Sequence, residues 1–422
     1  MKIMVVGGGG REHAIIKKIK ENPAVETIYA LPGNGGMAED AQCVDIGAKD
    51  IDGMVEFALK NNVDFAVVAP DDPLVLGAVD RLEEAGIPCF GPKANAAILE
   101  GSKVFSKQLM KKYGIPTAEY QVFSAAEEAL AYLETAPYPT VIKADGLALG
   151  KGVIIAQTAQ EAKEAVISIM EDRIFGESGR QIVVEEFLTG PEVSVLAFTD
   201  GKTVKPMVSS MDHKRALDGD KGLNTGGMGT VAPNPYYTQE IADECMRTIF
   251  LPTIEAMNKE GRPFQGCLYF GLMLTLKGPK VIEYNCRFGD PETQVVLPLL
   301  ESDLLTVMRA CREGTLAECD VKFSKKAAAC VVMASKGYPQ KYQTGYEIHV
   351  APAFSGQLFV AGAKRQGESL VTAGGRVLGV AATGETLRQA VEEAYHQCRF
   401  VTFENAYCRG DIGQKALAAL KE

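Results

Sequence analysis

The chain opens with an apolar run that leads into four consecutive glycines and then into a helix-like segment. Residues 2–6 predict a buried strand, and residues 11–21 place Ala14, Ile15 and Ile19 on one face of a helix. Shorter apolar strands follow at 27–31, 64–70 and 88–91, separated by helical stretches. This alternation is typical of a parallel α/β sheet, because parallel strands need crossover connections. We therefore predict a parallel α/β domain over residues 1–102.

From Lys103 onward the pattern changes to β-hairpins and helices. Apolar strands at 140–145 and 152–157 flank a glycine loop, and further strands are predicted within 181–188, 193–199 and 271–285. Ser124 with Glu127, and Thr158 with Glu161, match the capping box that opens a helix. These features predict a mixed α+β domain over 103–325 and a small α+β domain over 326–422.

Charge and cysteine content exclude several classes of protein. The formal net charge of −10 argues against a surface that coats nucleic acid, which needs a basic face. Ten cysteines occur without a C-x-x-C pair, as expected in a reduced, cytoplasmic compartment. No apolar run approaches 18 residues, and the run before the first glycine is too short for a signal sequence, so we expect no membrane association.

The glycines of VVGGGGREHA favour a phosphate contact over a dinucleotide fold. Glycines between a strand and a helix let backbone N–H groups meet a phosphate. If Gly7 and Gly9 begin a G-x-G-x-x-G motif, however, Glu12 stands where the third glycine belongs, and PGNGG follows the second strand where a ribose-binding acid is expected. The phosphate of a smaller ligand fits better, and a purely structural tight turn is the alternative.

The loop KADGLALGKGV, residues 143–153, differs from a Walker A loop. Gly152 stands where Ser or Thr would hold magnesium, and the loop joins two strands. Such a flap can close over a triphosphate, with its backbone N–H groups and Lys151 facing the anion. Lys143 ends an apolar strand, where an ammonium group needs a neutralising anion. Lysines that extend to solvent are the alternative for both positions.

VIEYNCRFGDPETQ, residues 281–294, ends an apolar strand in alternating ionic side chains. Strand periodicity sends Glu283, Asn285 and Arg287 to one face. Carboxylate and amide oxygens suit Mg²⁺, which usually shares its coordination with substrate phosphates. The guanidinium matches a carboxylate or a phosphoryl group. A solvent-exposed ladder of ion pairs is the alternative.

Together these stretches resemble the ATP-grasp superfamily and, within it, the phosphoribosylamine–glycine ligase family. The resemblance spans essentially the whole chain, because ten motifs occur in the family's order. They are GGGGREHA, PGNGG, LEGSK, IPTAEY, VIKADGLALGKGV, EEFLTGPE, DHKR, NTGGMG, IEYNCRFGDPETQ and CRGDIG. The resemblance implies an N-terminal α/β domain, an ATP-grasp domain with a small lid at about 120–190, and a C-terminal α+β domain.

The resemblance also implies roles for individual residues. Mg²⁺ or Mn²⁺ would be held by Glu283 and Asn285. A catalytic role would fall to Lys143, Asp212, Arg287 and Asp290. ATP would be contacted by Lys103, Lys143, Gly150, Lys151, Gly152, Glu185, Glu186, Phe187, Leu188 and Glu192. The substrates would be contacted by Gly8, Gly9, Gly10, Arg11, Glu12, His13, Asn34, Gly35, Asp212, Lys214, Gly227, Arg287 and Asp290.

The implied reaction joins glycine to 5-phosphoribosylamine through a glycyl phosphate, with ADP and phosphate as products, in purine biosynthesis. We expect small-molecule partners, no nucleic acid or membrane, and a monomer or weak dimer. Two departures from the family pattern stand out: Gly271 occupies the place of a second metal-binding acid, and PDDPL leaves the role of Asp71 open. The alternatives are a ligase for another acid or amine, a nucleotide-binding protein without turnover, and a nicotinamide oxidoreductase.

Overall fold

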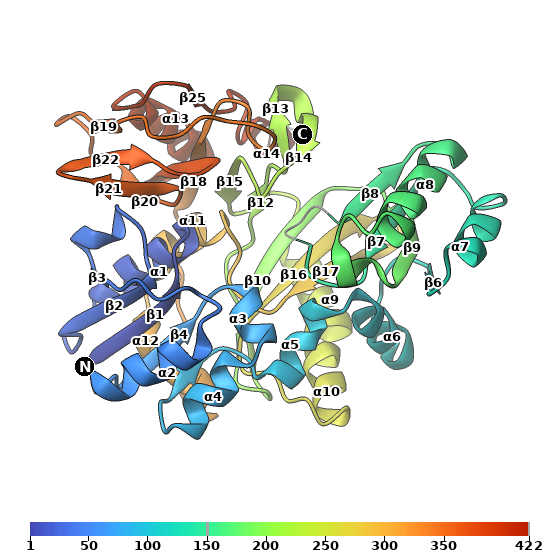
Figure 1. Cartoon of the computed structure of the whole chain (residues 1–422), viewed down its shortest axis with the longest axis horizontal. Coiled ribbons are helices and arrows are strands. Elements are labelled where there is room, and N and C mark those ends of the chain that lie inside the picture. Colours follow the sequence, from blue (N-terminus) through green and yellow to red (C-terminus); the bar gives the residue numbers. More distant parts are fainter. Residues whose placement is uncertain (149–151, 421–422) are drawn as a thin grey trace.

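The computed structural model describes residues 1–148 and 152–420 and begins with a parallel sheet (Figure 1). Its strand order is β3-β2-β1-β4-β5, and every pairing is parallel. The strands are β1 (Lys2–Gly7), β2 (Thr27–Pro32), β3 (Gln42–Cys43), β4 (Phe65–Val68) and β5 (Cys89–Phe90). The helices are α1 (Gly10–Lys20), α2 (Ile51–Lys60), α3 (Asp71–Val75), α4 (Ala78–Glu84) and α5 (Ala94–Gly101).

The central strand β1 is buried on both faces. Ile3 and Val5 belong to the same apolar cluster as Ile15 of α1, whereas Met4 and Val6 share a cluster with Met54 of α2. Because side chains alternate along a strand, a continuous apolar run is what a sheet covered on both faces requires. The α/β prediction for this region is confirmed.

Two antiparallel sheets follow. One has the order β11-β10-β16-β17 and the other β6-β9-β7-β8, and in Figure 1 the second forms a lobe at the right with α7 and α8. The first contains β10 (Glu192–Thr199), β11 (Val204–Pro206), β16 (Gly266–Thr275) and β17 (Gly278–Asn285). The second contains β6 (Tyr120–Phe123), β7 (Thr140–Ala144), β8 (Val153–Ala156) and β9 (Ile182–Glu186). Their helices are α6 (Lys103–Tyr113), α7 (Ala126–Leu133), α8 (Ala159–Val166), α9 (Gln239–Cys245), α10 (Leu251–Lys259), α11 (Thr293–Val296) and α12 (Leu304–Glu313).

A third antiparallel sheet, of six strands, combines C-terminal strands with two strands from the middle of the chain. Its order is β12-β15-β18-β23-β20, with β25 also paired to β18. Residues on both sides of position 325 therefore share one sheet, and the domain limits at 102 and 325 stay a prediction. The strands are β12 (Met211–Asp212), β15 (Gly229–Ala232), β18 (Ala327–Ser335), β20 (Gln357–Val360), β23 (Arg376–Gly384) and β25 (Ala406–Tyr407).

Three small hairpins or strand pairs and two helices complete this part of the molecule. Helix α13 packs against the six-stranded sheet, as the shared apolar cluster of Val331, Ala390 and Val391 shows. The helices are α13 (Leu387–Cys398) and α14 (Gln414–Ala419). The paired strands are β13 (Arg215–Leu217) with β14 (Lys221–Asn224), β19 (His349–Val350) with β24 (Val401–Thr402), and β21 (Ala363–Gln366) with β22 (Ser369–Thr372).

The two predicted capping boxes have different outcomes. Thr158 caps α8, because its side chain accepts a hydrogen bond from the Glu161 backbone N–H (3.2 Å), but the Glu161 side chain accepts from the backbone N–H of Gln157, so only half of the box forms. The prediction for Ser124 is wrong, because α7 begins after Ala125, which has no side-chain cap. Within residues 1–148 and 152–420, no helix is both long and apolar enough to cross a membrane.

Candidate active site at the end of strand β17

The alternation predicted for the end of β17 is present. Tyr284 and Cys286 are buried, and the Tyr284 ring lies edge-on to Phe270 in the core. Glu283 is half-buried on the opposite face, where its side chain is 33% exposed. The buried half of the strand therefore fixes the direction of the polar half.

Three lysines surround the Glu283 carboxylate. Burial alone would raise the pKa of Glu283, but the nearby ammonium groups hold it below its ordinary value. These groups are Lys103, Lys143 and Lys214. The Lys214 ammonium lies 3.8 Å from Glu283 Oε1 and 3.5 Å from Glu192 Oε2. Glu192 is thus brought to the same cluster, as its proposed contact with ATP requires.

Two of the predicted ATP lysines make contacts around the lobe that contains β7: Lys143 joins β7 to β17, and Lys103 joins α6 to the loop after β7. Lys143 Nζ donates to the Ile282 carbonyl (3.0 Å) and lies 3.1 Å from Glu185 Oε1. Lys103 Nζ donates to the Gly146 carbonyl (3.0 Å). Burial lowers the pKa of Lys103, whose ammonium is therefore short of compensating anions. Such a group is suited to bind a phosphate.

Lys107 is a member of this cluster that the sequence analysis did not identify. Its side chain is 2% exposed, and its ammonium lies 3.2 Å from Glu185 Oε2. Burial lowers the pKa of Lys107 to about 8, while Glu185 opposes the shift. The spacing of Lys103 and Lys107 on one helix was a possible signal, because residues four apart share a helix face.

The segment from Glu185 to Leu188, which is predicted to contact ATP, begins in β9 and continues past its end. Glu186 pairs with Lys280 (2.8 Å), which holds the pKa of Glu186 below its ordinary value. Phe187 is 38% exposed, and Leu188 is half-buried. An exposed aromatic ring is a suitable surface for a base to stack on.

The glycine flap is only partly described. Its flanking strands β7 and β8 pair antiparallel, as predicted, and the Gly152 carbonyl accepts from the Ala144 N–H (2.9 Å). Gly150 and Lys151, both predicted to contact ATP, lie outside the described residues.

The N-terminal glycines pack closely against other backbone and side-chain atoms. Gly7 has φ +123°, a conformation that L side chains rarely adopt. An added Cβ at Gly8 would lie 2.6 Å from the Gly33 carbonyl oxygen, and one at Gly10 would lie 2.6 Å from Gln294 Nε2. Close packing therefore explains these glycines without a ligand, and phosphate binding remains a proposal.

Arg11 and Glu12 join this turn to the loop after β17. Glu12 accepts from the Gly9 N–H (2.7 Å) and from Arg11 Nε (2.6 Å). Arg11 Nη1 donates to the Phe288 carbonyl (3.2 Å), and its backbone N–H lies 3.4 Å from Asp290 Oδ2. The glycine turn and the loop that carries Asp290 are consequently neighbours.

His13 and Asn34 use the polar atoms that were expected to contact substrate to make hydrogen bonds within the protein. His13 Nδ1 accepts from the Val360 N–H (2.8 Å), and its Nε2 lies 3.0 Å from Asp40 Oδ2. Asn34 Nδ2 donates to the Gly8 and Val360 carbonyls (3.0 and 2.8 Å). Asn34 Oδ1 accepts from the N–H groups of Gly36 and Met37 (2.9 and 3.1 Å). These polar atoms are already occupied, so the geometry favours a positioning role over direct contact.

The backbone N–H of Gly35 is used in the same way. It donates to the Ala363 carbonyl (3.0 Å), so the PGNGG loop is attached to the C-terminal part of the chain.

A second group of buried charges lies around Asp212. Burial and the neighbouring Glu292 raise its pKa well above the ordinary value. Burial would also raise the pKa of Asp290, but Arg376 and Arg11 hold it below its ordinary value. The pKa shifts of the two aspartates are therefore opposite, because a carboxylate neighbours Asp212 whereas two guanidinium groups neighbour Asp290.

Arg376, from β23, is a further residue that the sequence analysis missed. Its Nη1 donates to the carbonyls of Gly226 (2.8 Å), Gly227 (3.4 Å) and Asp290 (2.9 Å). Gly227 has φ +116°, and a Cβ there would lie 2.7 Å from Asp212 Oδ1. Arg376 thus fastens two predicted substrate loops to the C-terminal sheet.

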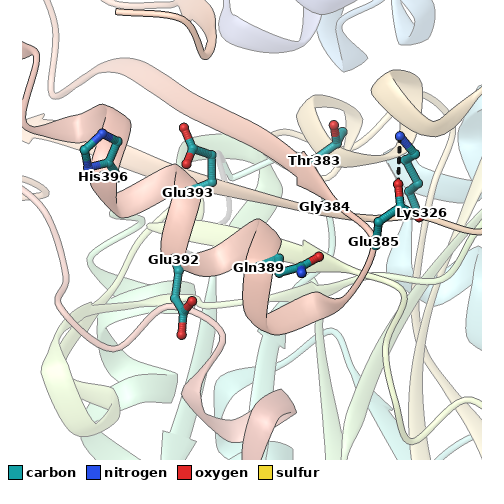
Figure 2. A pocket seen from close by; sticks show the side chains of 8 residues that line it. All are labelled: Lys326, Thr383, Gly384, Glu385, Gln389, Glu392, Glu393 and His396. Carbon is teal, nitrogen blue, oxygen red and sulfur yellow. Dashed lines mark ion pairs between the residues drawn. The ribbon is translucent and has the colours of Figure 1, made fainter.

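A hollow of about 530 Å³ on helix α13 is separate from this site. Figure 2 shows eight lining residues, among them Glu392 and Glu393, which point in different directions. Among the predicted site residues that the structure describes, none lines it. It therefore adds nothing to the chemistry at β17.

Comparison with known protein families identifies the family to which the chain belongs. Three models of phosphoribosylglycinamide synthetase match the chain: the N domain at residues 1–100, the ATP-grasp (A) domain at 101–293 and the C domain at 328–415. The chain belongs to this family. The resemblance given by the sequence motifs is confirmed, and so is the predicted three-part mixed α/β architecture.

Relatives of the phosphoribosylglycinamide synthetase family match over nearly their full length. Phosphoribosylamine–glycine ligases of Caldanaerobacter subterraneus and Clostridium acetobutylicum are each 47% identical to this chain, and each match covers 98% of it. The matches cover 99% of the first relative and 100% of the second. The crystal structure of phosphoribosylamine–glycine ligase from Thermotoga maritima has a TM-score of 0.84 and 35% identity, covering 98% of this chain and 100% of that one.

A biotin carboxylase domain from Hydrogenobacter thermophilus, solved with MgADP, has a TM-score of 0.76 at 16% identity. It covers 96% of this chain and 91% of that chain, and it shows a shared fold alone.

Membership of the phosphoribosylglycinamide synthetase family makes the chain an ATP-dependent C–N ligase. The predicted enzyme class and the predicted glycine-ligating reaction of purine biosynthesis are confirmed.

Proposed function

We propose that the side chains at the end of β17 bind the triphosphate of ATP with a divalent cation, and that this site activates glycine for attack by 5-phosphoribosylamine. The observation that carries the proposal is the group of lysines near Glu283: the Lys214 ammonium lies 3.8 Å from its carboxylate, and Lys143 and Lys103 are close enough to help hold its pKa down. Glu192 pairs with Lys214 and Glu185 pairs with Lys143. The partly buried ammonium of Lys103, which donates to the Gly146 carbonyl, is therefore the group best placed to bind an added anion.

The residues present fit a magnesium or manganese ion shared with phosphates. No cluster of three or more His, Cys, Asp or Glu side chains forms a complete metal site within the described part of the chain. Glu283 and Asn285 offer two oxygen ligands, and Mg²⁺ commonly takes the rest from phosphates and water. When bound, the cation would neutralise charge on the β- and γ-phosphates. Gly271, which pairs with Glu283 across the sheet, adds no ligand.

Arg287 is proposed to bind the carboxylate of glycine and the phosphoryl group transferred to it. Its Nε is buried and has no hydrogen-bond partner among the residues that the structure describes. Burial opposes its charge, but Glu100 and Asp71 raise its pKa above the ordinary value. A charged donor with an unused N–H suits an anionic substrate.

In the first step, a carboxylate oxygen of glycine attacks the γ-phosphorus of ATP, and the bond to the β,γ-bridging oxygen breaks to release ADP. In the second, the amine nitrogen of 5-phosphoribosylamine attacks the acyl carbon of glycyl phosphate and phosphate leaves. Asp212 is the proposed acceptor of the proton released, because burial and Glu292 raise its pKa. Positioning and charge neutralisation supply the rest of the rate enhancement.

For the amine substrate, we propose the glycine turn at Gly8–Gly10 as the phosphate contact. It lies at the N-terminus of α1, where backbone N–H groups and the helix dipole attract anions. The hydrogen bonds from Arg11 to the β17 loop support this assignment, because they bring the turn to the site of acyl transfer. His13, Asn34 and Gly35 hold the surrounding loop.

The test uses glycine labelled with ¹⁸O in its carboxylate, together with ATP, Mg²⁺ and freshly prepared 5-phosphoribosylamine. We expect glycinamide ribonucleotide, ADP and phosphate in equal amounts, with one ¹⁸O atom in each phosphate, because a glycyl phosphate passes a carboxylate oxygen to phosphate. Unlabelled phosphate would exclude the acyl phosphate. Faster ADP release with another acid or amine would change the substrate assignment, and ATP binding without phosphate release would indicate a nucleotide-binding protein.

A further inference from the structure

Glu100 is a buried carboxylate that reaches the candidate site from the N-terminal part of the chain. It lies near the C-terminus of α5, and its side chain is only 6% exposed. Its Oε2 accepts from the backbone N–H of Cys286 (2.6 Å), and its Oε1 lies 3.0 Å from Arg287 Nη2. A carboxylate buried to this extent needs such donors. All of them come from the end of β17.

The same carboxylate determines the orientation of the Asn285 side-chain amide. With Nδ2 directed at Glu100 Oε1 (3.0 Å) and at the Tyr284 carbonyl (3.3 Å), the amide meets two acceptors. In the opposite orientation its oxygen would face those acceptors and accept one long hydrogen bond, from Arg287 Nη2 (3.4 Å), which is less favourable. The favourable orientation leaves Oδ1 on the side of the amide away from Glu100. A cation can be coordinated by this oxygen but not by the amide nitrogen.

Glu100 also limits the freedom of the Arg287 guanidinium. Nη2 is held by Glu100, and Nη1 donates to the Phe288 carbonyl (3.3 Å). The remaining Nε has no partner among the described residues. With two of its three nitrogens fixed, the guanidinium presents one N–H in a defined direction. Fixing a donor before the substrate arrives lowers the cost of reorganisation in the reaction.

We propose that Glu100 is a positioning residue, which turns the oxygen of Asn285 toward the divalent cation and fixes Arg287 for the substrate anion. The inference rests on the proposed function, because that function places the cation at Glu283 and Asn285. Glu100 itself contacts neither cation nor substrate. Its helix α5 follows the parallel sheet, so it connects the N-terminal part of the chain to the cation ligands.

Glu100→Gln removes the orienting carboxylate and keeps the size of the side chain. The glutamine has one acceptor oxygen, whereas the native carboxylate serves three donors, on Cys286, Asn285 and Arg287. If the oxygen accepts from Cys286, the new NH₂ group faces the NH₂ group of Asn285. The Asn285 amide then becomes more stable when it rotates by 180°, and this rotation directs its nitrogen at the cation.

The experiment measures Mn²⁺ binding in the presence of ADP by electron paramagnetic resonance. We expect Glu100→Gln to weaken Mn²⁺ affinity about 10-fold or more, the usual effect of losing a partner that orients a metal ligand. The double variant Glu100→Gln with Asn285→Asp should recover most of this loss. An aspartate offers oxygen in either orientation, the glutamine NH₂ can donate to it, and the pair keeps its single negative charge.

The matched control is Asp80→Asn. Asp80 Oδ2 accepts from the backbone N–H of Ala94 at the start of the same helix α5 (2.8 Å) but does not reach the site. This variant should lower the melting temperature while leaving Mn²⁺ affinity unchanged. Equal loss of affinity in both variants would reduce Glu100 to a structural role and overturn the proposal.

Unchanged affinity in Glu100→Gln, or no recovery in the double variant, would also overturn it. Failure of the proposed function is a separate result: the wild-type protein would bind Mn²⁺ with ADP, and respond to Glu100→Gln, yet show no glycine-dependent ADP release. Absence of ADP-dependent Mn²⁺ binding in the wild type would overturn both the cation site and the role of Glu100.

Discussion

Glu283 is the residue on which the charge balance of the site depends. It lies among three ammonium groups, and they hold its pKa below the ordinary value despite burial. The carboxylate is therefore ionised at neutral pH and available as an oxygen ligand. Its position follows from strand alternation, because Tyr284 and Cys286 are buried on the other face.

Glu283→Ala should reduce glycine-dependent ADP release by ~10² or more, the typical effect of removing one group that stabilises charge in a transition state. The measurement is a coupled ADP assay at saturating ATP and glycine. Glu260→Ala is the comparison, because Glu260 pairs with Lys112 at the surface and has no contact with the site. Retained turnover of Glu283→Ala at saturating Mg²⁺ would remove Glu283 from the proposed role.

Some residues of the site were accessible to sequence reasoning and others were not. The spacing of Glu283, Asn285 and Arg287 is a strand pattern, which needs only the period of two. Glu100 is 186 residues away from the backbone N–H that it accepts from. His13 and Asn34 lie in recognisable motifs, but only their contacts with Val360 show that their polar atoms are occupied.

At the scale of elements, His213 joins β15 to the start of the last helix. Its Nδ1 lies 3.0 Å from the Gly229 carbonyl, and its Nε2 accepts from the Gly413 N–H (3.1 Å). The neutral ring with its proton on Nδ1 satisfies both contacts. A protonated ring would lose the second, and burial lowers the pKa of His213 to about 4.

This contact predicts a loss of stability in mild acid. The unfolded chain takes up a proton near pH 6.5 whereas the folded protein does not until about pH 4, so the unfolded state is favoured as the pH falls between these values. The penalty is up to about 1.4 kcal/mol for each pH unit between 6.5 and about 4. Urea unfolding at pH 7 and pH 5 should show a smaller acid effect in His213→Gln than in the wild type.

His349→Gln is the matched control, because the His349 side chain is 65% exposed. Its pH dependence should equal that of the wild type. If His213→Gln keeps the full wild-type difference between pH 7 and pH 5, the contact does not cause the acid sensitivity.

Across the whole molecule, the site is assembled from parts of several sheets. Helix α5 follows the parallel sheet and supplies Glu100, the lobe with β7 and β9 in Figure 1 supplies Lys143 and Glu185, and β23 supplies Arg376. A ligand that contacts more than one of these parts should stabilise the folded protein by mass action.

ADP with Mg²⁺ should therefore raise the melting temperature. At an ADP concentration of 100 times Kd, the free energy of unfolding should increase by about 2.7 kcal/mol. Adding EDTA should remove most of the increase, because Glu283 would then face the phosphates without a cation between them. Differential scanning calorimetry of the wild type and of Glu283→Ala checks this. An increase that is equal with and without EDTA would contradict a shared cation site.

The amino-acid sequence by itself determined the order of the elements, the parallel character of the first sheet and the polar face of β17. These depend on local periodicity and on glycine positions, which are properties of short segments. The tertiary structure decided that Glu100, Lys107 and Arg376 belong to the site and that His13 and Asn34 have their polar atoms occupied by other parts of the chain. Such roles depend on which distant donors and acceptors meet, and that is set only when the sheets pack together.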